Sequence, residues 1–192
     1  MNTNRLEAFS DGVLAIIITI MVLELKPPEG VELEALKPLL HDVLSYALSF
    51  LYVGIYWNNH HHLVKATRRV TGGGLWANLH LLFWLSLFPF VTAWLGRTSA
   101  MPAPTAVYGG VLLMAAIAYY VLQLAITAHQ ENARVKSALG RDWKGKLSPV
   151  IYLVAIPVAH FAPWISMGLY TAVALIWLVP DRRMERTLGS GS

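Results

Sequence analysis

Six apolar runs alternate with short polar segments along the chain. By residue number they are 6–25, 43–64, 75–95, 106–128, 147–161 and 163–179. A helix needs about 20 mostly apolar residues to cross the hydrocarbon core of a bilayer, and the first four runs meet that length. The last two are shorter and are separated only by the corner at Ala162 and Pro163. The pattern predicts an all-α, polytopic membrane protein with six transmembrane helices per subunit.

The composition supports this class of protein and excludes several others. Apolar residues make up 56% of the chain and charged residues 14%, with a mean hydropathy of +0.50. Soluble domains have roughly 45–50% apolar and about 25% charged residues, so an ordinary soluble enzyme, a coiled coil and a disordered protein are excluded. We expect residues 1–187 to form one domain. Residues 188–192, Leu-Gly-Ser-Gly-Ser, resemble a flexible linker, and we interpret them as a linker or tag remnant.

The positions of the basic residues predict the orientation in the membrane. If both termini lie inside, 12 of the 15 basic residues fall on the inner side and three, Lys26, Lys37 and Arg97, on the outer side. The inner set is Arg5, Lys65, Arg68, Arg69, Arg134, Lys136, Arg141, Lys144, Lys146, Arg182, Arg183 and Arg186. Cytoplasmic loops carry such an excess of Lys and Arg. We therefore expect a multi-pass protein of the cell membrane with both termini in the cytoplasm, and the net charge of +4 needs no nucleic-acid partner.

The segment between the first two runs mixes acidic and apolar residues. Glu29, Glu32, Glu34 and Asp42 alternate there with several leucines, and Pro38 interrupts the pattern. A short interfacial helix leading into the second span and a solvated loop both fit this pattern.

Polar residues gather near the inner ends of the first three spans. They are Arg5, Ser10, Asp11, Trp57, Asn58, Asn59, His60, His61, His62, Trp76, Asn78 and His80. Polar groups at membrane depth are costly and are candidates for function. Arg5 and Asp11 lie six residues apart, about 240° around a helix, so they should not pair with each other. Taken alone, the residues favour a layer that ties helices together over a site that binds a substrate.

The three consecutive histidines do not predict a metal site. Neighbouring residues on a helix point about 100° apart, so His60, His61 and His62 cannot all face one ion. The absence of cysteine excludes disulfides, zinc–thiolate sites and iron–sulfur clusters. We find no nucleophile elbow and no phosphate-binding loop, and therefore expect neither an enzyme nor a cofactor.

The start of the first span carries the most specific motif. Arg5-x-x-x-Phe9-Ser10-Asp11 resembles the opening of the first membrane helix in the transmembrane protein 175 family of potassium channels. The resemblance implies a homotetramer of six-span subunits whose first helices line a central pore. It also implies a constriction of bulky aliphatic side chains and a polar network that joins the helices. The candidates for that network are Arg5, Phe9, Ser10, Asp11, Trp57, His60, His61, Trp76 and Asn78.

Helical spacing selects the residues that would line such a pore. Ile16, Thr19, Ile20 and Leu23 lie on one helix face. An aliphatic stripe of this kind ordinarily packs inside a protein, and only the resemblance makes it a candidate filter. An apolar ring can gate by dewetting, and Thr19 would add a polar ring. Potassium would pass transiently, without a tightly bound metal.

Two other functions remain open at this point. A secondary transporter or proton-conducting protein would use Asp11 and the histidines 60–62 as relay groups. A small membrane enzyme would need those histidines to bind a metal. The leading hypothesis is a potassium channel whose partners are potassium ions, the lipid bilayer and other copies of this chain.

Overall fold

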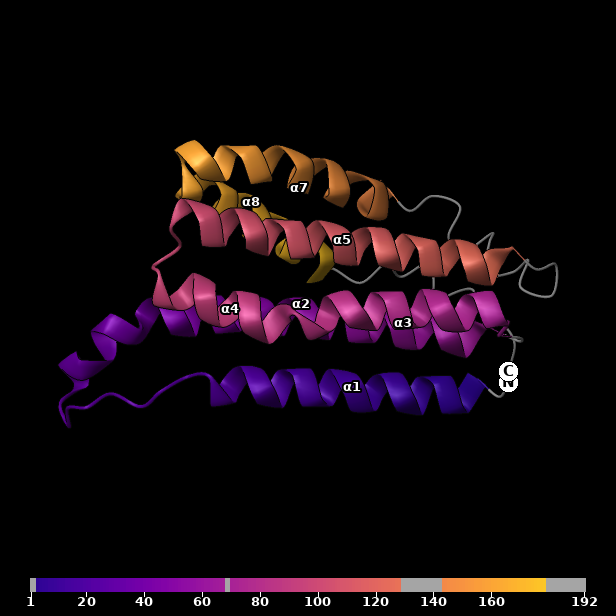
Figure 1. Cartoon of the computed structure of the whole chain (residues 1–192), viewed down its shortest axis with the longest axis horizontal. Helices are drawn as coiled ribbons and strands as arrows, with labels where there is room; N and C mark the ends of the chain where they lie inside the picture. The colour runs from indigo at the N-terminus through magenta and orange to yellow at the C-terminus, as the bar shows by residue number, and fades with distance from the viewer. Residues whose placement is uncertain (1–2, 68–69, 129–142, 179–192) are drawn as a thin grey trace.

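The computed structural model describes residues 3–67, 70–128 and 143–178, and within these ranges the chain is helical (Figure 1). The helices are α1 (Thr3–Leu23), α2 (Leu40–Ala66), α3 (Gly72–Ser86), α4 (Phe88–Arg97), α5 (Pro102–Thr127), α7 (Trp143–Phe161) and α8 (Pro163–Leu178). The described residues contain no β-strand. Since α3 and α4 together form the third span, the predicted all-α architecture with six spans is confirmed.

The third span contains a break that the pattern of apolar residues did not predict. We expected one helix over 75–95, but Leu87 separates α3 from α4. Pro89 lies at the start of α4 and has no backbone N–H, so the helical hydrogen-bond ladder cannot continue through it. Leu87 keeps helix-like angles (φ −82°, ψ −11°), and its N–H bonds the carbonyl of Trp84 at 3.3 Å. The proline therefore interrupts the span without ending it.

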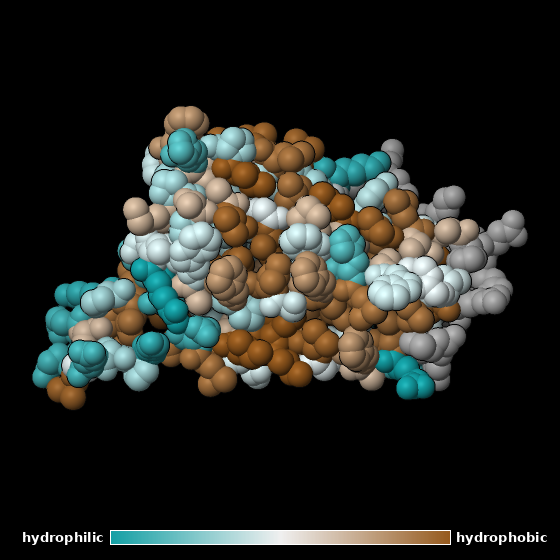
Figure 2. All heavy atoms as spheres, viewed as in Figure 1, coloured by the Kyte–Doolittle hydropathy of each residue, from teal (hydrophilic) through white to brown (hydrophobic). Residues whose placement is uncertain are grey.

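The membrane-facing surface agrees with the composition. By length and composition, four helical segments can cross a bilayer: Thr3–Leu23, Leu33–Ala66, Gly72–Arg97 and Pro102–Thr127. The apolar α8 is shorter, with 16 residues, and α7 contains Pro149 and Pro157. Hydrophobic side chains cover the middle of the face shown in Figure 2, and hydrophilic ones gather at the end that carries η1 (Leu33–Leu39). This 3₁₀ helix occupies the segment between the first two spans, for which the sequence allowed an interfacial helix.

Helix α1 lies at one edge of the bundle (Figure 1). It packs on α2, α3 and α4 through a single face, on which Leu6, Leu14, Ile17 and Met21 are buried. Helix α5 lies between the α3–α4 segment and α7. The hydrophobic core thus sits among α2 to α8, and α1 contributes to it from one side only.

Hydroxyl groups inside the core bond one another. Thr92 donates to Ser49 at 2.7 Å, and Ser49 lies 3.0 Å from the hydroxyl of Tyr108. Tyr152 donates to the hydroxyl of Tyr52 at 3.2 Å, and Tyr52 donates to the carbonyl of Tyr170 at 2.6 Å. Buried polar groups are stable only when they are bonded in this way. The pattern of apolar runs could not have shown these pairs, because they join distant helices.

Two adjacent glycines on α5 give a matched test of helix packing. A Cβ at Gly109 would overlap the ring and hydroxyl of buried Tyr170, whereas a Cβ at Gly110 would meet nothing within 4 Å. We expect Gly109→Ala to lower the free energy of unfolding by about 1–3 kcal/mol through overpacking. Gly110→Ala should raise it by about 0.5–1 kcal/mol, since alanine loses less entropy in a helix. Thermal unfolding of the two purified variants measures the difference, and equal midpoints would contradict the packing of α8 on α5.

Candidate pore helix and its polar anchor

The surface of α1 that faces away from its own subunit is aliphatic. The exposed fractions of Ile16, Ile20 and Leu23 are 58%, 43% and 79%. Thr19 is exposed between them, and its hydroxyl donates to the carbonyl of Ile16 at 2.8 Å. That bond uses the hydroxyl proton and leaves oxygen lone pairs available. The four residues predicted to line a pore thus share one face of α1, and all four are exposed in the described part of the subunit.

The opposite face of α1 is anchored by a buried chain of hydrogen bonds. Nε2 of His60 on α2 lies 2.7 Å from the amide oxygen of Asn78 on α3. The amide nitrogen of Asn78 donates to the hydroxyl of Ser10 on α1 at 3.0 Å. Ser10 in turn donates to the carbonyl of Leu6 at 2.8 Å. Ser10, His60 and Asn78 are buried. One amide side chain therefore links three helices at the same depth.

The donors and acceptors in this series of hydrogen bonds determine which ring nitrogen of His60 carries a proton. The amide oxygen of Asn78 can only accept, so Nε2 of His60 must carry a proton. Its Nδ1 is buried and has no hydrogen-bond partner among the described residues. A neutral imidazole with its proton on Nε2 satisfies this arrangement, because Nδ1 then presents only a lone pair.

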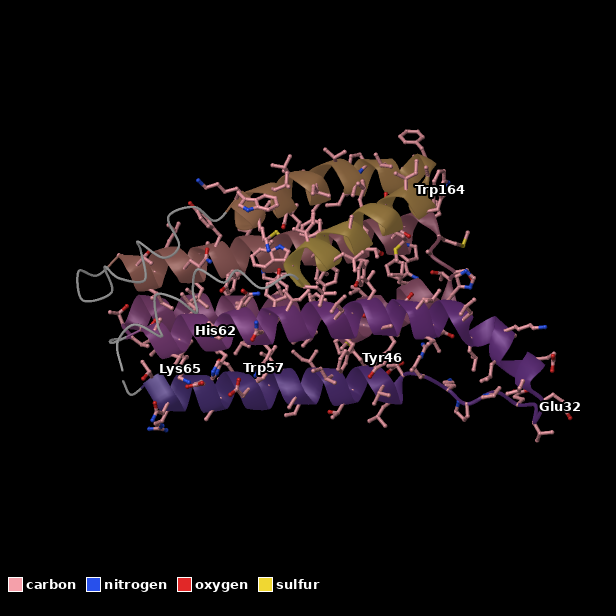
Figure 3. The ribbon with its side chains drawn as sticks, turned by 180° about the vertical axis from the view of Figure 1, so that it is seen from behind. Glu32, Tyr46, Trp57, His62, Lys65 and Trp164 are labelled. Carbon is pink, nitrogen blue, oxygen red and sulfur yellow. The ribbon has the colours of Figure 1, made fainter. Side chains whose placement is uncertain are left out.

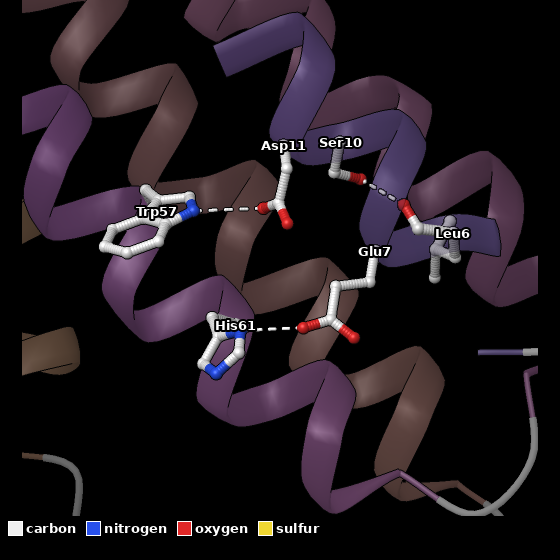
Figure 4. A network of polar contacts seen from close by, with 6 residues as sticks. All are labelled: Leu6, Glu7, Ser10, Asp11, Trp57 and His61. Carbon is white, nitrogen blue, oxygen red and sulfur yellow. Dashed lines mark hydrogen bonds and ion pairs between the residues drawn. The ribbon is translucent and has the colours of Figure 1, made fainter. Parts of the chain in front are cut away.

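A second set of contacts runs along the seam between α1 and α2 (Figure 4). The indole N–H of Trp57 donates to a carboxylate oxygen of Asp11 at 3.0 Å, and Nδ1 of His61 lies 2.7 Å from a carboxylate oxygen of Glu7. The rings of Trp57 and His61 stack with their centres 6.2 Å apart. Viewed from behind, Trp57 and Tyr46 lie on the side of α2 that faces α1 (Figure 3). Two helices are thus joined by two parallel polar contacts one helical turn apart.

Some predicted members of the polar network lie outside it. Arg5, Phe9 and Trp76 are exposed, and within the described residues none of them makes a side-chain hydrogen bond or ion pair. The exposed fractions of Phe9 and Trp76 are 53% and 75%. The structure therefore brings together Ser10, Asp11, Trp57, His60, His61 and Asn78, and leaves these three side chains at the surface of the single subunit.

Glu7 belongs to the anchor but was not among the predicted residues. It lies four residues before Asp11, as Trp57 lies four before His61. Residues four apart share a helix face, so two matching pairs on two helices could have indicated the seam.

The three adjacent histidines point to different partners. His60 lies against Asn78, His61 against Glu7, and the ring of His62 meets that of His61 edge-on at 5.6 Å. Within the described ranges there is no group of three or more His, Cys, Asp or Glu residues that could hold a metal ion.

At the other end of α1, Arg97 forms an exposed ion pair with Glu24, 2.5 Å apart.

These features define a multi-span α-helical membrane protein with its first helix set apart and anchored by polar side chains. The chain belongs to the TMEM175 family. The model of the family described as endosomal/lysosomal potassium channel TMEM175 matches residues 5–89. A protein of Chryseobacterium sp. named as a potassium channel is 53% identical over 189 residues, which cover 98% of each chain.

A solved structure and a vertebrate relative extend the comparison. The crystal structure of a lysosomal potassium-selective channel TMEM175 homolog from Chamaesiphon minutus superposes with a TM-score of 0.80 at 30% identity. The match covers 92% of this chain and 96% of that one. A Danio rerio protein named as an endosomal/lysosomal proton channel is 33% identical over 99 residues, and the match covers 43% of this chain and 18% of that protein.

Proposed function

We propose that this chain is the subunit of a potassium channel in which four copies place α1 around a central pore. The observation that carries the proposal is the uncovered aliphatic stripe of α1, opposite a face that is fixed by buried polar bonds. The relatives named as potassium channels indicate that the transported ion is potassium. Both termini lie in the cytoplasm of a cell-membrane protein, and potassium is the transported ion rather than a resident metal.

The positions of the helix ends and of the charged residues support this orientation in the membrane. The start of α1 and the end of α5 lie at one end of the bundle, and α7 runs away from that end while α8 runs back toward it (Figure 1). The basic residues Lys65, Lys144 and Lys146 belong to that same end, and acidic Glu29, Glu32 and Glu34 to the other. Placing the basic end in the cytoplasm follows the bias of inner loops toward Lys and Arg. Of the other inner basic residues, those at 68, 69, 134, 136, 141, 182, 183 and 186 lie outside the described residues, as does the tail at 188–192.

The proposed constriction is formed by rings of Ile16, Ile20 and Leu23, with Thr19 between them. Aliphatic side chains offer no replacement for the water shell of an ion, so a narrow ring empties of water and blocks the ion. A wider ring keeps water and conducts. The Thr19 oxygens would compensate for part of the water that an ion sheds there.

The polar residues act in this scheme as the anchor of the pore helix. Asp11 accepts from Trp57, and His60 and His61 bond Asn78 and Glu7 on neighbouring helices, so their polar atoms face the seams between helices. A transporter or proton pathway would need these same groups to face a transport route. Their engagement in helix contacts favours the channel.

Flux from liposomes tests the proposal. Purified protein should release potassium down its gradient without a coupled ion and without saturation, and should release sodium much more slowly. Proton uptake is measured in the same vesicles with valinomycin absent and then present. Potassium release that requires a counter-transported ion would support a transporter, and proton flux without potassium flux would support the proton-conducting alternative.

A further inference from the structure

A groove on the outward surface of the subunit lies directly beside the proposed pore stripe. Ile20 on α1 contributes to one wall, and Phe90 and Trp94 on α4 contribute to the other. The exposed ion pair of Glu24 and Arg97 lies at the end of the groove, which holds about 610 Å³ of open space. Because Ile20 belongs both to the stripe and to the groove, the groove opens where one subunit of a tetramer meets the next.

The α4 wall of this groove belongs to an uncovered aromatic surface. The exposed fractions of Phe90 and Trp94 are 64% and 37%, and the centres of their rings lie 6.2 Å apart. Trp76 and Phe83 are exposed as well and continue this surface along α3. The partly exposed His80 also lies on α3, and ionisable side chains at membrane depth rarely face lipid. Protein therefore suits this surface better as a partner than lipid does.

The two faces beside α1 lie on opposite sides of the bundle. Helices α3 and α4 lie in front in Figure 1, and α2 lies in front in the opposite view of Figure 3. Helix α1 lies at the edge of the bundle and packs on α2, α3 and α4. In a ring with α1 toward the axis, each subunit presents its α3–α4 face to one neighbour and its α2 face to the other. Rings of identical subunits are joined by such head-to-tail contacts between two different surfaces.

The depth of the groove identifies the residue of α2 that can reach it. Rotation about an axis along the helices leaves every residue at its own depth, so the partner must come from the depth of the groove. The 2.7 Å bond between Thr92 and Ser49 places these two residues at one level. Phe50 follows Ser49, and Phe90 and Trp94 lie two residues before and after Thr92. Phe50 is thus level with the aromatic wall, and its exposed fraction is 46%.

We propose that the ring of Phe50 in one subunit inserts into the groove of the next subunit, between Ile20 and the pair of Phe90 and Trp94. This contact presupposes the proposed tetramer and joins each subunit to its neighbour. An aromatic side chain buries about 150–250 Å² of surface, and pairs of rings add stability beyond that burial. Since the inserted ring packs against Ile20, it also sets the spacing between adjacent pore helices.

Cysteine cross-linking in reconstituted liposomes tests this contact, because the chain has no cysteine of its own. The double variant Phe50→Cys, Phe90→Cys is treated with a short bismaleimide, which spans the space of the two rings that are removed. We expect a denaturing gel to show a ladder up to four subunits, since every copy carries both halves of the contact. Each single variant should stay monomeric on the gel, and co-expression of the two single variants should give dimers.

The double variant Phe50→Cys, Val154→Cys is the matched control. Tyr152 bonds Tyr52, and Val154 lies two residues beyond Tyr152 as Phe50 lies two residues before Tyr52, so both positions have the same depth. Val154 is exposed to a similar extent as Phe90, at 54%, but it lies on α7, on the far side of α5 from α4 (Figure 1). This pair should give no product larger than a monomer.

Potassium release is measured in the same vesicles, so that the two proposals can fail separately. Monomers alone, in vesicles that release potassium, would refute the docking of Phe50 and leave the channel proposal standing. A ladder that stops at dimers, or equal product in the Val154 control, would also refute the docking. If the double variant does not fold, Phe50→Cys with Ala93→Cys, another position in the groove, is judged by the same ladder. Wild-type vesicles without potassium release would refute the proposed function itself.

Discussion

Replacing Ile16 with asparagine is expected to give a channel that passes more potassium and discriminates less against sodium. Ile16 is the first residue of the exposed stripe of α1, and four copies would form a ring in the proposed pore. Asparagine is smaller than isoleucine and bonds water, so the ring would be wider and would stay hydrated, and ions could cross with part of their water shell. We expect potassium flux to rise about tenfold, equivalent to lowering the barrier by about 1.4 kcal/mol, and the potassium-to-sodium ratio to approach one.

Single-channel current in planar bilayers measures both effects. Ile16→Leu should keep the ring apolar and conduct like the wild type. Val22→Asn is the matched control, since Val22 is also exposed on α1 (44%) but lies on another face of the helix. Unchanged current and selectivity in Ile16→Asn would remove Ile16 from the constriction. An equal rise in Val22→Asn would mean that polarity anywhere on α1, rather than the ring, sets the flux.

The spans could be predicted because the membrane imposes a length on apolar segments, and that length is visible in the sequence. The break at Leu87 was not predicted, since Pro89 lies inside an otherwise uniform apolar run and its effect is local. The boundaries of α2 extend beyond the predicted 43–64, to Leu40–Ala66, for a similar reason. Hydropathy locates where a helix crosses lipid, whereas helices continue past that point wherever backbone bonds allow.

The candidate site was predictable to the extent that it depends on helix periodicity. Ile16, Thr19, Ile20 and Leu23 share a face because the spacing requires it. The partners of Asp11 and His61 depend instead on the register between α1 and α2, which no single helix specifies, so Glu7 was missed.

The side chain of Asn78 should contribute more to the stability of the subunit than any other member of the polar anchor. It both accepts from His60 and donates to Ser10, so Asn78→Leu would leave the buried Nε2–H of His60 without an acceptor and would remove one of the two hydrogen bonds of Ser10, which keeps its bond to the carbonyl of Leu6. An unsatisfied buried group costs about 1–3 kcal/mol in proteins, while side-chain hydrogen bonds between membrane helices average about 0.6 kcal/mol. We therefore expect the free energy of unfolding to fall by about 2 kcal/mol, together with loss of potassium flux, because α1 is no longer held in position.

Asn58→Leu is the matched control for this prediction. Asn58 is an exposed asparagine on α2, so the same substitution there removes no buried bond and should leave unfolding and flux unchanged. Adding Ser10→Ala and His60→Leu to Asn78→Leu should recover part of the lost stability, because removing all partners together leaves no unsatisfied group. If Asn78→Leu unfolds like Asn58→Leu, the three-helix chain of bonds is not what holds α1. If the triple variant is stable but does not conduct, the polar bonds set the position of the pore helix rather than merely its stability.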